Sequence, residues 1–241
     1  MARRVVTPDA GAPQTTSEET SKTRRLLACG IVAGPLFLVV ALVQAFTRDG
    51  FDLSRHPISL LSLGELGWIQ IANFIVTGGL FVACAVGMRR VLRHGPGATW
   101  GPRLVGALGV GLIMGGVFIT DPGAGFPPGA PAGAPEQVSW HGILHNLAPI
   151  LAMDGMVIGC LVFARRFAAR KQWGWVAAGV GAAVTVVVLT FWPDLDGISV
   201  RLVLAQAIQF GFVAALAAHL MAGLPAASRP VTARIQPATT S

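Results

Sequence analysis

Residues 26–46 read LLACGIVAGPLFLVVALVQAF, a run that contains no charged residue. An α-helix needs about 20 predominantly apolar residues to cross the hydrocarbon core of a bilayer, which is roughly 30 Å thick. The run exceeds the apolar core of a secretory signal, typically about 7–15 residues, and 25 residues precede it. We therefore interpret it as a retained membrane span, which makes an integral membrane protein the first hypothesis for the fold.

The rest of the chain repeats this pattern. Hydrophobic residues make up 53% of the sequence and charged residues 12%, against a charged share of roughly 25% in soluble domains. We expect an all-α polytopic integral membrane protein, with six transmembrane helices in a domain that covers residues 25–224. Residues 1–24 and 225–241 are rich in Thr, Ser, Pro, Ala and charge, and we expect disordered tails there. The five further predicted spans are Ile69–Met88, Leu104–Ile119, Ile143–Ala164, Trp175–Trp192 and Leu202–Leu224.

Lysine and arginine are distributed unevenly over the connections between the spans. Fifteen of the 18 basic residues lie in the tails and in the second and fourth connections, whereas Arg48, Arg55 and Arg201 lie on the other side. The positive-inside rule therefore predicts both termini in the cytoplasm, for a multi-pass protein of the cell membrane. The net charge of +7 comes from short clusters and not from one basic surface, so the expected partner is the lipid bilayer and not nucleic acid.

The sequence offers little support for several common chemistries. Cys29, Cys84 and Cys160 all lie inside apolar runs, so we expect small buried hydrophobic residues and no disulfide framework. The chain contains no phosphate-binding glycine loop, CxxC, HExxH or GxSxG motif. ATP-driven work, dithiol redox chemistry and the familiar soluble hydrolase mechanisms are therefore unsupported.

Two long connections on the predicted extracytoplasmic side carry the unusual residues. Residues 47–68 read TRDGFDLSRHPISLLSLGELGW, which is too apolar for a freely solvated loop, so we expect a short helix or a re-entrant turn against the membrane surface. Residues 120–142 read TDPGAGFPPGAPAGAPEQVSWHG, where proline and glycine at high density predict irregular structure.

Three sequence blocks in these connections resemble a known family. They are HPISLLSLGELGWIQ at residues 56–70, DPGAGFPPG at 121–129 and HGILH at 141–145. In this order between six spans, they resemble the domain of unknown function 998 family of bacterial membrane proteins. The resemblance covers the chain from about Leu26 to Leu224. It implies six helices and no established activity.

The polar side chains of the two connections form our leading functional hypothesis. We expect them to gather into a polar cap on the extracytoplasmic face that binds a lipid, a small molecule or a protein partner. The candidate residues are Asp52, Arg55, His56, Asp121, His141 and His145.

The histidines also allow a different interpretation. His141 and His145 are four residues apart, which places both imidazoles on one face of a helix. With His56 they would supply three ligands for a catalytic zinc ion, so the alternative function is a metal-dependent membrane hydrolase at the outer surface. Histidine also titrates near neutral pH, so the same residues are candidates for proton sensing. The simplest interpretation is hydrogen bonding of the rings to loop carbonyls.

Asp154 is the one acidic residue inside a predicted span, about halfway along the fourth. An ionisable residue at that depth indicates function by default. At about 100° per residue it lies roughly opposite His145 on a straight helix, so the two cannot serve one site. We expect it to pair with Asn73, Gln206 or Gln209 of other spans, either as an interhelical hydrogen-bonding group or as a proton or cation relay in a transporter.

Overall fold

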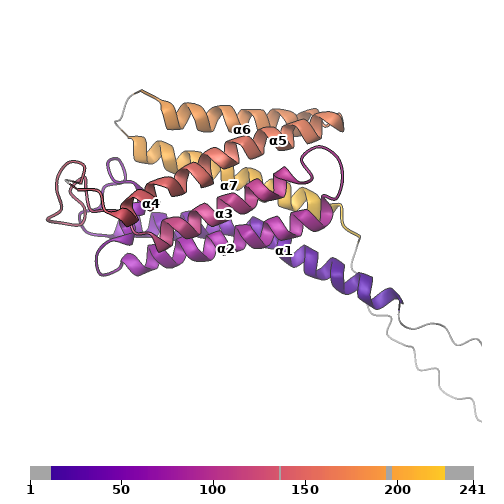
Figure 1. Ribbon diagram of the computed structural model, residues 1–241, viewed down its shortest axis with the longest axis horizontal. Coiled ribbons are helices and arrows are strands. Elements are labelled where there is room, and N and C mark those ends of the chain that lie inside the picture. Colours follow the sequence, from indigo (N-terminus) through magenta and orange to yellow (C-terminus); the bar gives the residue numbers. More distant parts are fainter. Residues whose placement is uncertain (1–11, 136, 194–196, 226–241) are drawn as a thin grey trace, which may run out of the picture.

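Long apolar helices run side by side in the computed structural model, which describes residues 12–135, 137–193 and 197–225 (Figure 1). All elements of the described residues are helical, apart from one isolated β-bridge between Gly123 and Phe126. The elements are α1 (Ala12–Thr47), the 3-10 helix η1 (Ile58–Ser62), α2 (Gly67–Val91), α3 (Trp100–Val117), α4 (Trp140–Pro149), the π-helical segment η2 (Ile150–Asp154), α5 (Gly155–Ala169), α6 (Trp173–Phe191) and α7 (Ile198–Ala222).

Six of these helical stretches are long and apolar enough to cross a membrane, which confirms the predicted six-span architecture. The fourth span is the continuous stretch α4–η2–α5, from Trp140 to Ala169. The short helix expected in the first long connection is η1. The second long connection, residues 118–139, contains no helix among its described residues, as its proline and glycine content predicts.

The first helix begins earlier than the sequence predicts. Residues 12–24 were expected to belong to a disordered tail, but α1 starts at Ala12. An ion pair explains part of the extension, because Lys22 Nζ lies 2.6 Å from Glu18 Oε1 one turn away, in the orientation that favours a helix. The remaining tail residues, 1–11 and 226–241, lie outside the described residues.

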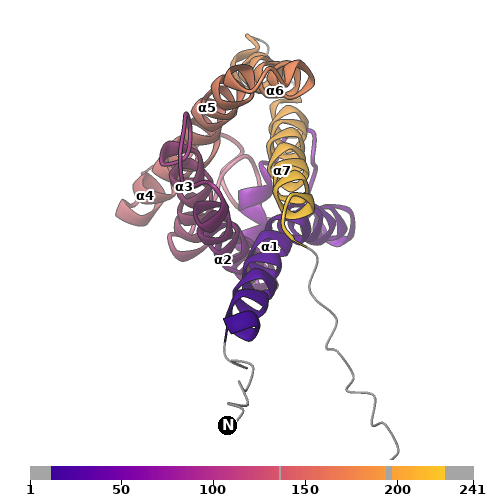
Figure 2. The ribbon, with the colours of Figure 1, turned by 90° about the vertical axis from the view of Figure 1, so that its right-hand side faces the viewer.

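The spans pack in a ring. Each helix contacts its neighbours in the order α1, α2, α3, α5, α6 and α7, and α7 returns to α1 (Figure 2). Both ends of the described chain lie at one end of this ring (Figure 1). The opposite end carries residues 48–66 and 118–139, which we call the cap, so we call it the cap end.

Aromatic residues fill the ring between α1, α2 and α7. Phe210 of α7 lies 5.6 Å from Phe37 of α1 and 5.0 Å from Phe81 of α2, measured between ring centroids. All three side chains are essentially inaccessible to solvent. Phe210 thus joins two other large rings in the core, and it also borders the space that remains open nearer the cap.

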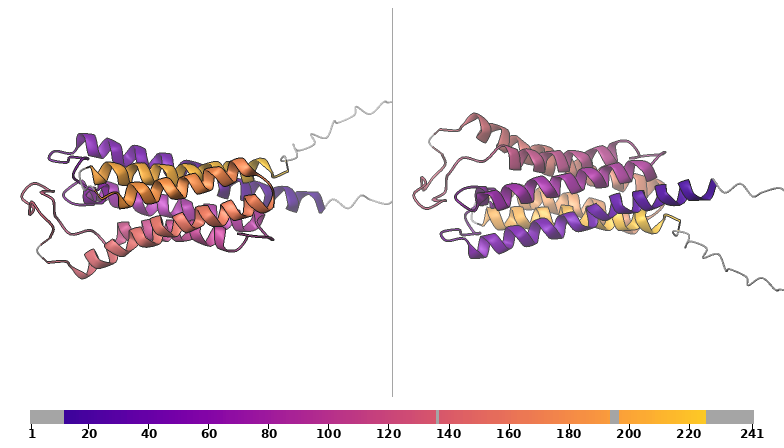
Figure 3. Two further views of the ribbon diagram at one scale, coloured as in Figure 1. Left: turned by 90° about the horizontal axis from the view of Figure 1, so that it is seen from above. Right: turned by 90° about the horizontal axis from the view of Figure 1, so that it is seen from below.

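The fourth span bends where α4 meets η2. Pro149 has no N–H to donate to the carbonyl of His145, which removes one helical hydrogen bond. The next turn is π-helical, and Gly155 N–H donates to Ile150 O, five residues earlier. At the cap end α4 diverges from α7 (Figure 3). Consequently α4 packs mainly on α3 and η2.

Candidate functional site

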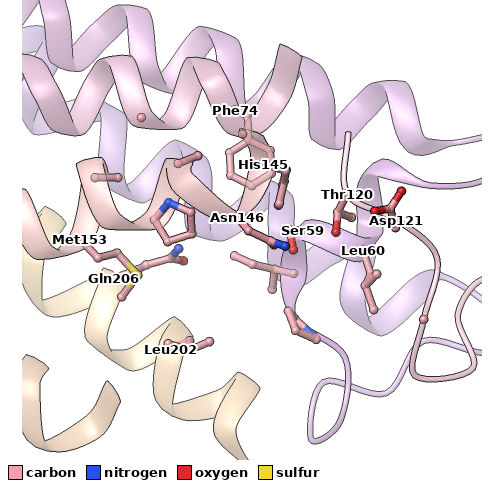
Figure 4. Close-up of a pocket in the computed structure, with 18 of the residues that line it drawn as sticks. Ser59, Leu60, Phe74, Thr120, Asp121, His145, Asn146, Met153, Leu202 and Gln206 are labelled. Carbon is pink, nitrogen blue, oxygen red and sulfur yellow. The ribbon is translucent and has the colours of Figure 1, made fainter. Parts of the chain in front are cut away.

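A cavity of about 570 Å³ lies at the cap end of the ring (Figure 4). Side chains of α3, α4, η2 and α7 form its walls, and residues of the cap close over it. Its apolar lining includes Phe74, Leu108, Leu112, Ala152, Met153, Leu202 and Phe210. Its polar lining consists of Ser59, Thr120, Asp121, His145, Asn146, Gln206 and Gln209.

The polar groups are spread along the cavity. Ser59, Thr120 and Asp121 come from the cap, whereas Gln206 comes from α7 and lies beside Met153 further from the cap (Figure 4). His145 and Asn146 of α4 lie between these two sets of residues (Figure 4). The cavity therefore combines a predominantly apolar surface with a few hydrogen-bonding groups, as small-molecule sites generally do.

His56 joins the two connections that form the cap. Its Nδ1 accepts a hydrogen bond from the backbone N–H of Asp52, at 2.8 Å, so this nitrogen carries no proton. Its Nε2, 2.9 Å from Ala124 O, must then carry the proton and donate it to that carbonyl. The buried imidazole is thus neutral and in one tautomer, and it ties residue 52 to residue 124.

A small aromatic cluster surrounds this histidine. Phe51 and Phe126 lie 5.3 and 5.6 Å from the His56 ring, between centroids. The guanidinium carbon of Arg48 lies 5.4 Å from the centre of the Phe126 ring. Arg48 also donates to the carbonyl of Leu61 at 3.0 Å, and its burial lowers the pKa of the guanidinium. The cap is therefore a packed unit with its own core.

Asp121 anchors the start of α4. Its two carboxylate oxygens accept hydrogen bonds from the hydroxyl of Ser139 at 2.6 Å and from the backbone N–H of Ser139 at 3.0 Å. The Ser139 hydroxyl in turn accepts from Gly142 N–H and caps the helix. The hydrogen bond from the Ser139 hydroxyl is the main cause that holds the pKa of Asp121 below its usual value. Asp121 is therefore ionised at neutral pH.

The six residues predicted to form one polar cap are divided by the structure. Asp121 and His145 line the cavity. Arg55 is exposed, and its guanidinium makes no hydrogen bond to any described residue. The other three candidates do not line the cavity, and each makes hydrogen bonds elsewhere; they are Asp52, His56 and His141.

The three histidines of the predicted zinc site are not assembled. Among the described residues, no group of three or more His, Cys, Asp or Glu side chains could hold a metal ion. Nδ1 of His141 lies 2.8 Å from Ile119 O, and Nδ1 of His145 lies 2.7 Å from Phe118 O. These contacts agree with the interpretation of bonding to loop carbonyls, and His56 uses both of its nitrogens in hydrogen bonds to the backbone.

Asp154 does not pair with the expected partners. Its side chain is exposed on the outside of the bundle and makes no hydrogen bond to a described residue. Asn73 instead donates to Phe37 O at 3.1 Å, in a buried contact between α2 and α1. The predicted interhelical pair does not form because Asp154 faces outward, whereas His145 is buried.

The glutamines of α7 were expected only as partners of Asp154, and they are instead residues of the cavity. Gln209 is fully buried, and its Nε2 donates to Met153 O in the π-helical segment at 2.8 Å. The side-chain oxygens of Gln206 and Gln209 are buried and have no partner among the described residues. The available signal was two amides three residues apart in an otherwise apolar span, which places both on one helical face.

Comparison with known proteins identifies a family model that covers most of the chain. The model of the family described as "Protein of unknown function (DUF998)" matches residues 31–227. No curated protein and no solved structure matches the chain.

Proposed function

The chain belongs to the DUF998 family, as its three loop blocks predict, and because that family has no known function we propose one from the cavity itself: the protein binds a small amphiphilic molecule drawn from the membrane. The observation that carries this proposal is the cavity of about 570 Å³, whose lining is mostly apolar with a few polar groups. Ligand pockets typically measure roughly 300–1,000 Å³ and have this composition.

The walls of the cavity favour a ligand that arrives from the bilayer. Asn146 and Pro149 line the cavity but are exposed on the surface of the bundle. Both belong to α4, which diverges from α7 at the cap end (Figure 3). We propose that an apolar tail enters between α4 and α7, both of which line the cavity, and so reaches it from lipid without crossing water.

A cavity-filling variant tests this function. The probe is a monoacylglycerol with a photoreactive diazirine in its acyl chain, added to membranes that contain the full-length protein. We expect cross-links to map to α4 and α7, and Leu202→Trp to reduce labelling at least about tenfold, because an indole would occupy the cavity that Leu202 lines.

The matched control lies two residues along the same helix. Leu204 is 49% exposed on the outer surface of α7, so Leu204→Trp should leave labelling unchanged. Equal labelling of the wild type and Leu202→Trp would refute binding in the cavity.

We also propose that the cap end is extracytoplasmic, with both termini in the cytoplasm of a cell-membrane protein. The support is the distribution of lysine and arginine. Of these 18 residues, 15 lie at or beyond the end of the spans opposite the cap. In intact cells, an impermeant maleimide should label Glu65→Cys in the cap and not Arg170→Cys between α5 and α6, both of which are exposed positions. The reverse pattern would invert the topology.

A further inference from the structure

The cavity presents acceptors more than donors, and from this we propose the chemistry of the ligand's head group: it donates hydrogen bonds, as hydroxyl groups do, and carries no negative charge. This inference rests on the proposed binding function and narrows it. Three observations carry it, namely the fixed amide of Gln209, the unpaired amide of Gln206 and the charge of the lining.

The amide of Gln209 has only one possible orientation. Oxygen and nitrogen of a side-chain amide are usually assigned from their partners. Here the partner is the carbonyl of Met153, which only accepts hydrogen bonds, so the atom 2.8 Å away must be the donating Nε2. The other atom, Oε1, is therefore an acceptor, and it is buried without a donor among the described residues. A buried acceptor left unpaired destabilises a protein, because it has lost its hydrogen bonds to water.

Gln206 adds a second unpaired amide on the same helical face, which no partner holds in place, so it can turn its oxygen to a donor of the ligand. It lies one turn from Gln209, lines the same cavity and makes no hydrogen bond to any described residue. A ligand with two neighbouring hydroxyl groups would satisfy both oxygens at once. The two glutamines thus form an acceptor pair in an otherwise apolar part of the wall.

The charge of the lining excludes an anionic head group. Asp121 and His145 are the ionisable side chains of the described lining, which contains no lysine or arginine. Sites that bind phosphate or carboxylate use cationic side chains or clusters of backbone N–H groups. The ionised carboxylate of Asp121 would instead repel an anion and accept hydrogen bonds from a neutral hydroxyl.

Three probes with the same 12-carbon tail separate these possibilities. They are 1-monolauroylglycerol, which is neutral with two O–H donors; methyl laurate, which is neutral without donors; and dodecyl phosphate, which is anionic. The full-length protein is held in phosphatidylcholine nanodiscs, because that head group has no hydrogen-bond donor, and binding is measured by displacement of the photoreactive probe.

We expect 1-monolauroylglycerol to bind at least about tenfold more tightly than methyl laurate, the effect of one or two net hydrogen bonds. Dodecyl phosphate should bind more weakly than 1-monolauroylglycerol. Equal affinity of all three probes, or preference for the phosphate, would overturn the head-group inference and leave cavity binding intact. Failure of every probe to displace the label would overturn the binding function itself.

Variants test whether the acceptor pair causes the preference for 1-monolauroylglycerol. Gln209→Leu and Gln206→Leu should each reduce the preference for 1-monolauroylglycerol over methyl laurate by about three- to tenfold, with binding of methyl laurate retained. Gln206→Leu removes no hydrogen bond to a described residue, so it keeps the test valid if Gln209→Leu fails to fold. Gln172→Leu is the matched control, because its Oε1 is also buried and unpaired but lies outside the cavity. An unchanged preference in both cavity variants would refute the assignment.

Discussion

His56 and Gln209 show how much one hydrogen-bond partner decides about a side chain. Asp52 N–H can only donate, so it makes Nδ1 of His56 an acceptor and places the proton on Nε2. Met153 O can only accept, so it fixes the amide of Gln209 and leaves its oxygen unpaired. The histidine is satisfied and holds the cap together, whereas the glutamine lacks a donor for its oxygen. By this criterion the glutamine, and not the histidine, belongs to the binding site.

Asp121 gives the protein a stability term that depends on pH. Its hydrogen bonds to Ser139 lower its pKa in the folded state below that of the unfolded chain, which is about 3.9. Asp121 therefore stabilises the fold above about pH 4, and this contribution is lost as the pH falls through the folded-state value. We expect Asp121→Asn to lower the melting temperature at neutral pH, and the difference from the wild type to shrink in acid.

Thermal unfolding of both proteins between about pH 7 and pH 3, a range that spans the unfolded-state pKa, measures this effect. Glu65→Gln is the control, because Glu65 is an exposed carboxylate in the same cap and makes no hydrogen bond to a described residue. A difference between wild type and Asp121→Asn that stays constant over the whole pH range would contradict the proposed linkage.

For Asp154 we expect the opposite result, namely that its replacement does not destabilise the fold. Because its side chain is exposed on the bundle and has no partner among the described residues, Asp154→Leu breaks no contact within the chain. We expect the free energy of unfolding to change by less than about 0.5 kcal/mol or to increase. Asn73→Leu serves as comparison, since it removes buried hydrogen bonds to Phe37 O and Gln70 and should be clearly destabilising. A large loss of stability in Asp154→Leu would show that Asp154 has a partner within the fold.

At the scale of elements, the fourth span is the part of the ring that departs from regular geometry. The π-helical segment Ile150–Asp154 follows Pro149 directly, and together they interrupt the regular α-helical geometry between α4 and α5. Such segments occur frequently at functional sites. Here the irregular turn supplies the Met153 carbonyl that Gln209 binds, and it lies next to α4, where we propose an opening towards α7.

Replacing Pro149 should close that opening. Pro149→Ala restores the missing N–H and removes a helix-breaking ring that destabilises a helix interior by about 3 kcal/mol. We expect α4 to straighten towards α7, with greater thermal stability and weaker binding of the photoreactive probe. Spin labels at the exposed positions Leu147 and Leu204 would report a shorter distance between α4 and α7. An unchanged distance would mean that packing on α3, and not the proline, sets the tilt.

At the scale of the whole molecule, the architecture is predictable from sequence because each span must satisfy its own backbone in lipid. That constraint makes the six spans visible as apolar runs, and the helices confirm them. The cavity was not predictable, because it depends on which faces meet. His56 lies in the cap and His141 at the start of α4, both near Asp121 in the predicted topology, yet only Asp121 of these three lines the cavity. The π-helical turn that begins at Ile150 leaves no pattern that distinguishes it from a regular helix.

The ring itself depends on a close approach between α2 and α3. Gly78 and Gly109 face each other across this contact, and a Cβ at either position would meet the backbone carbonyl oxygen of the other. Gly109→Leu should therefore push the two helices apart and lower the free energy of unfolding by about 1–3 kcal/mol or more. Gly79→Leu is the matched control, because a Cβ at Gly79 has no neighbour within 4 Å. Since α3 also forms a wall of the cavity, Gly109→Leu should weaken probe binding as well, and Gly79→Leu should not. Equal stability of the two variants would show that α2 and α3 tolerate separation and that this contact does not hold the ring together.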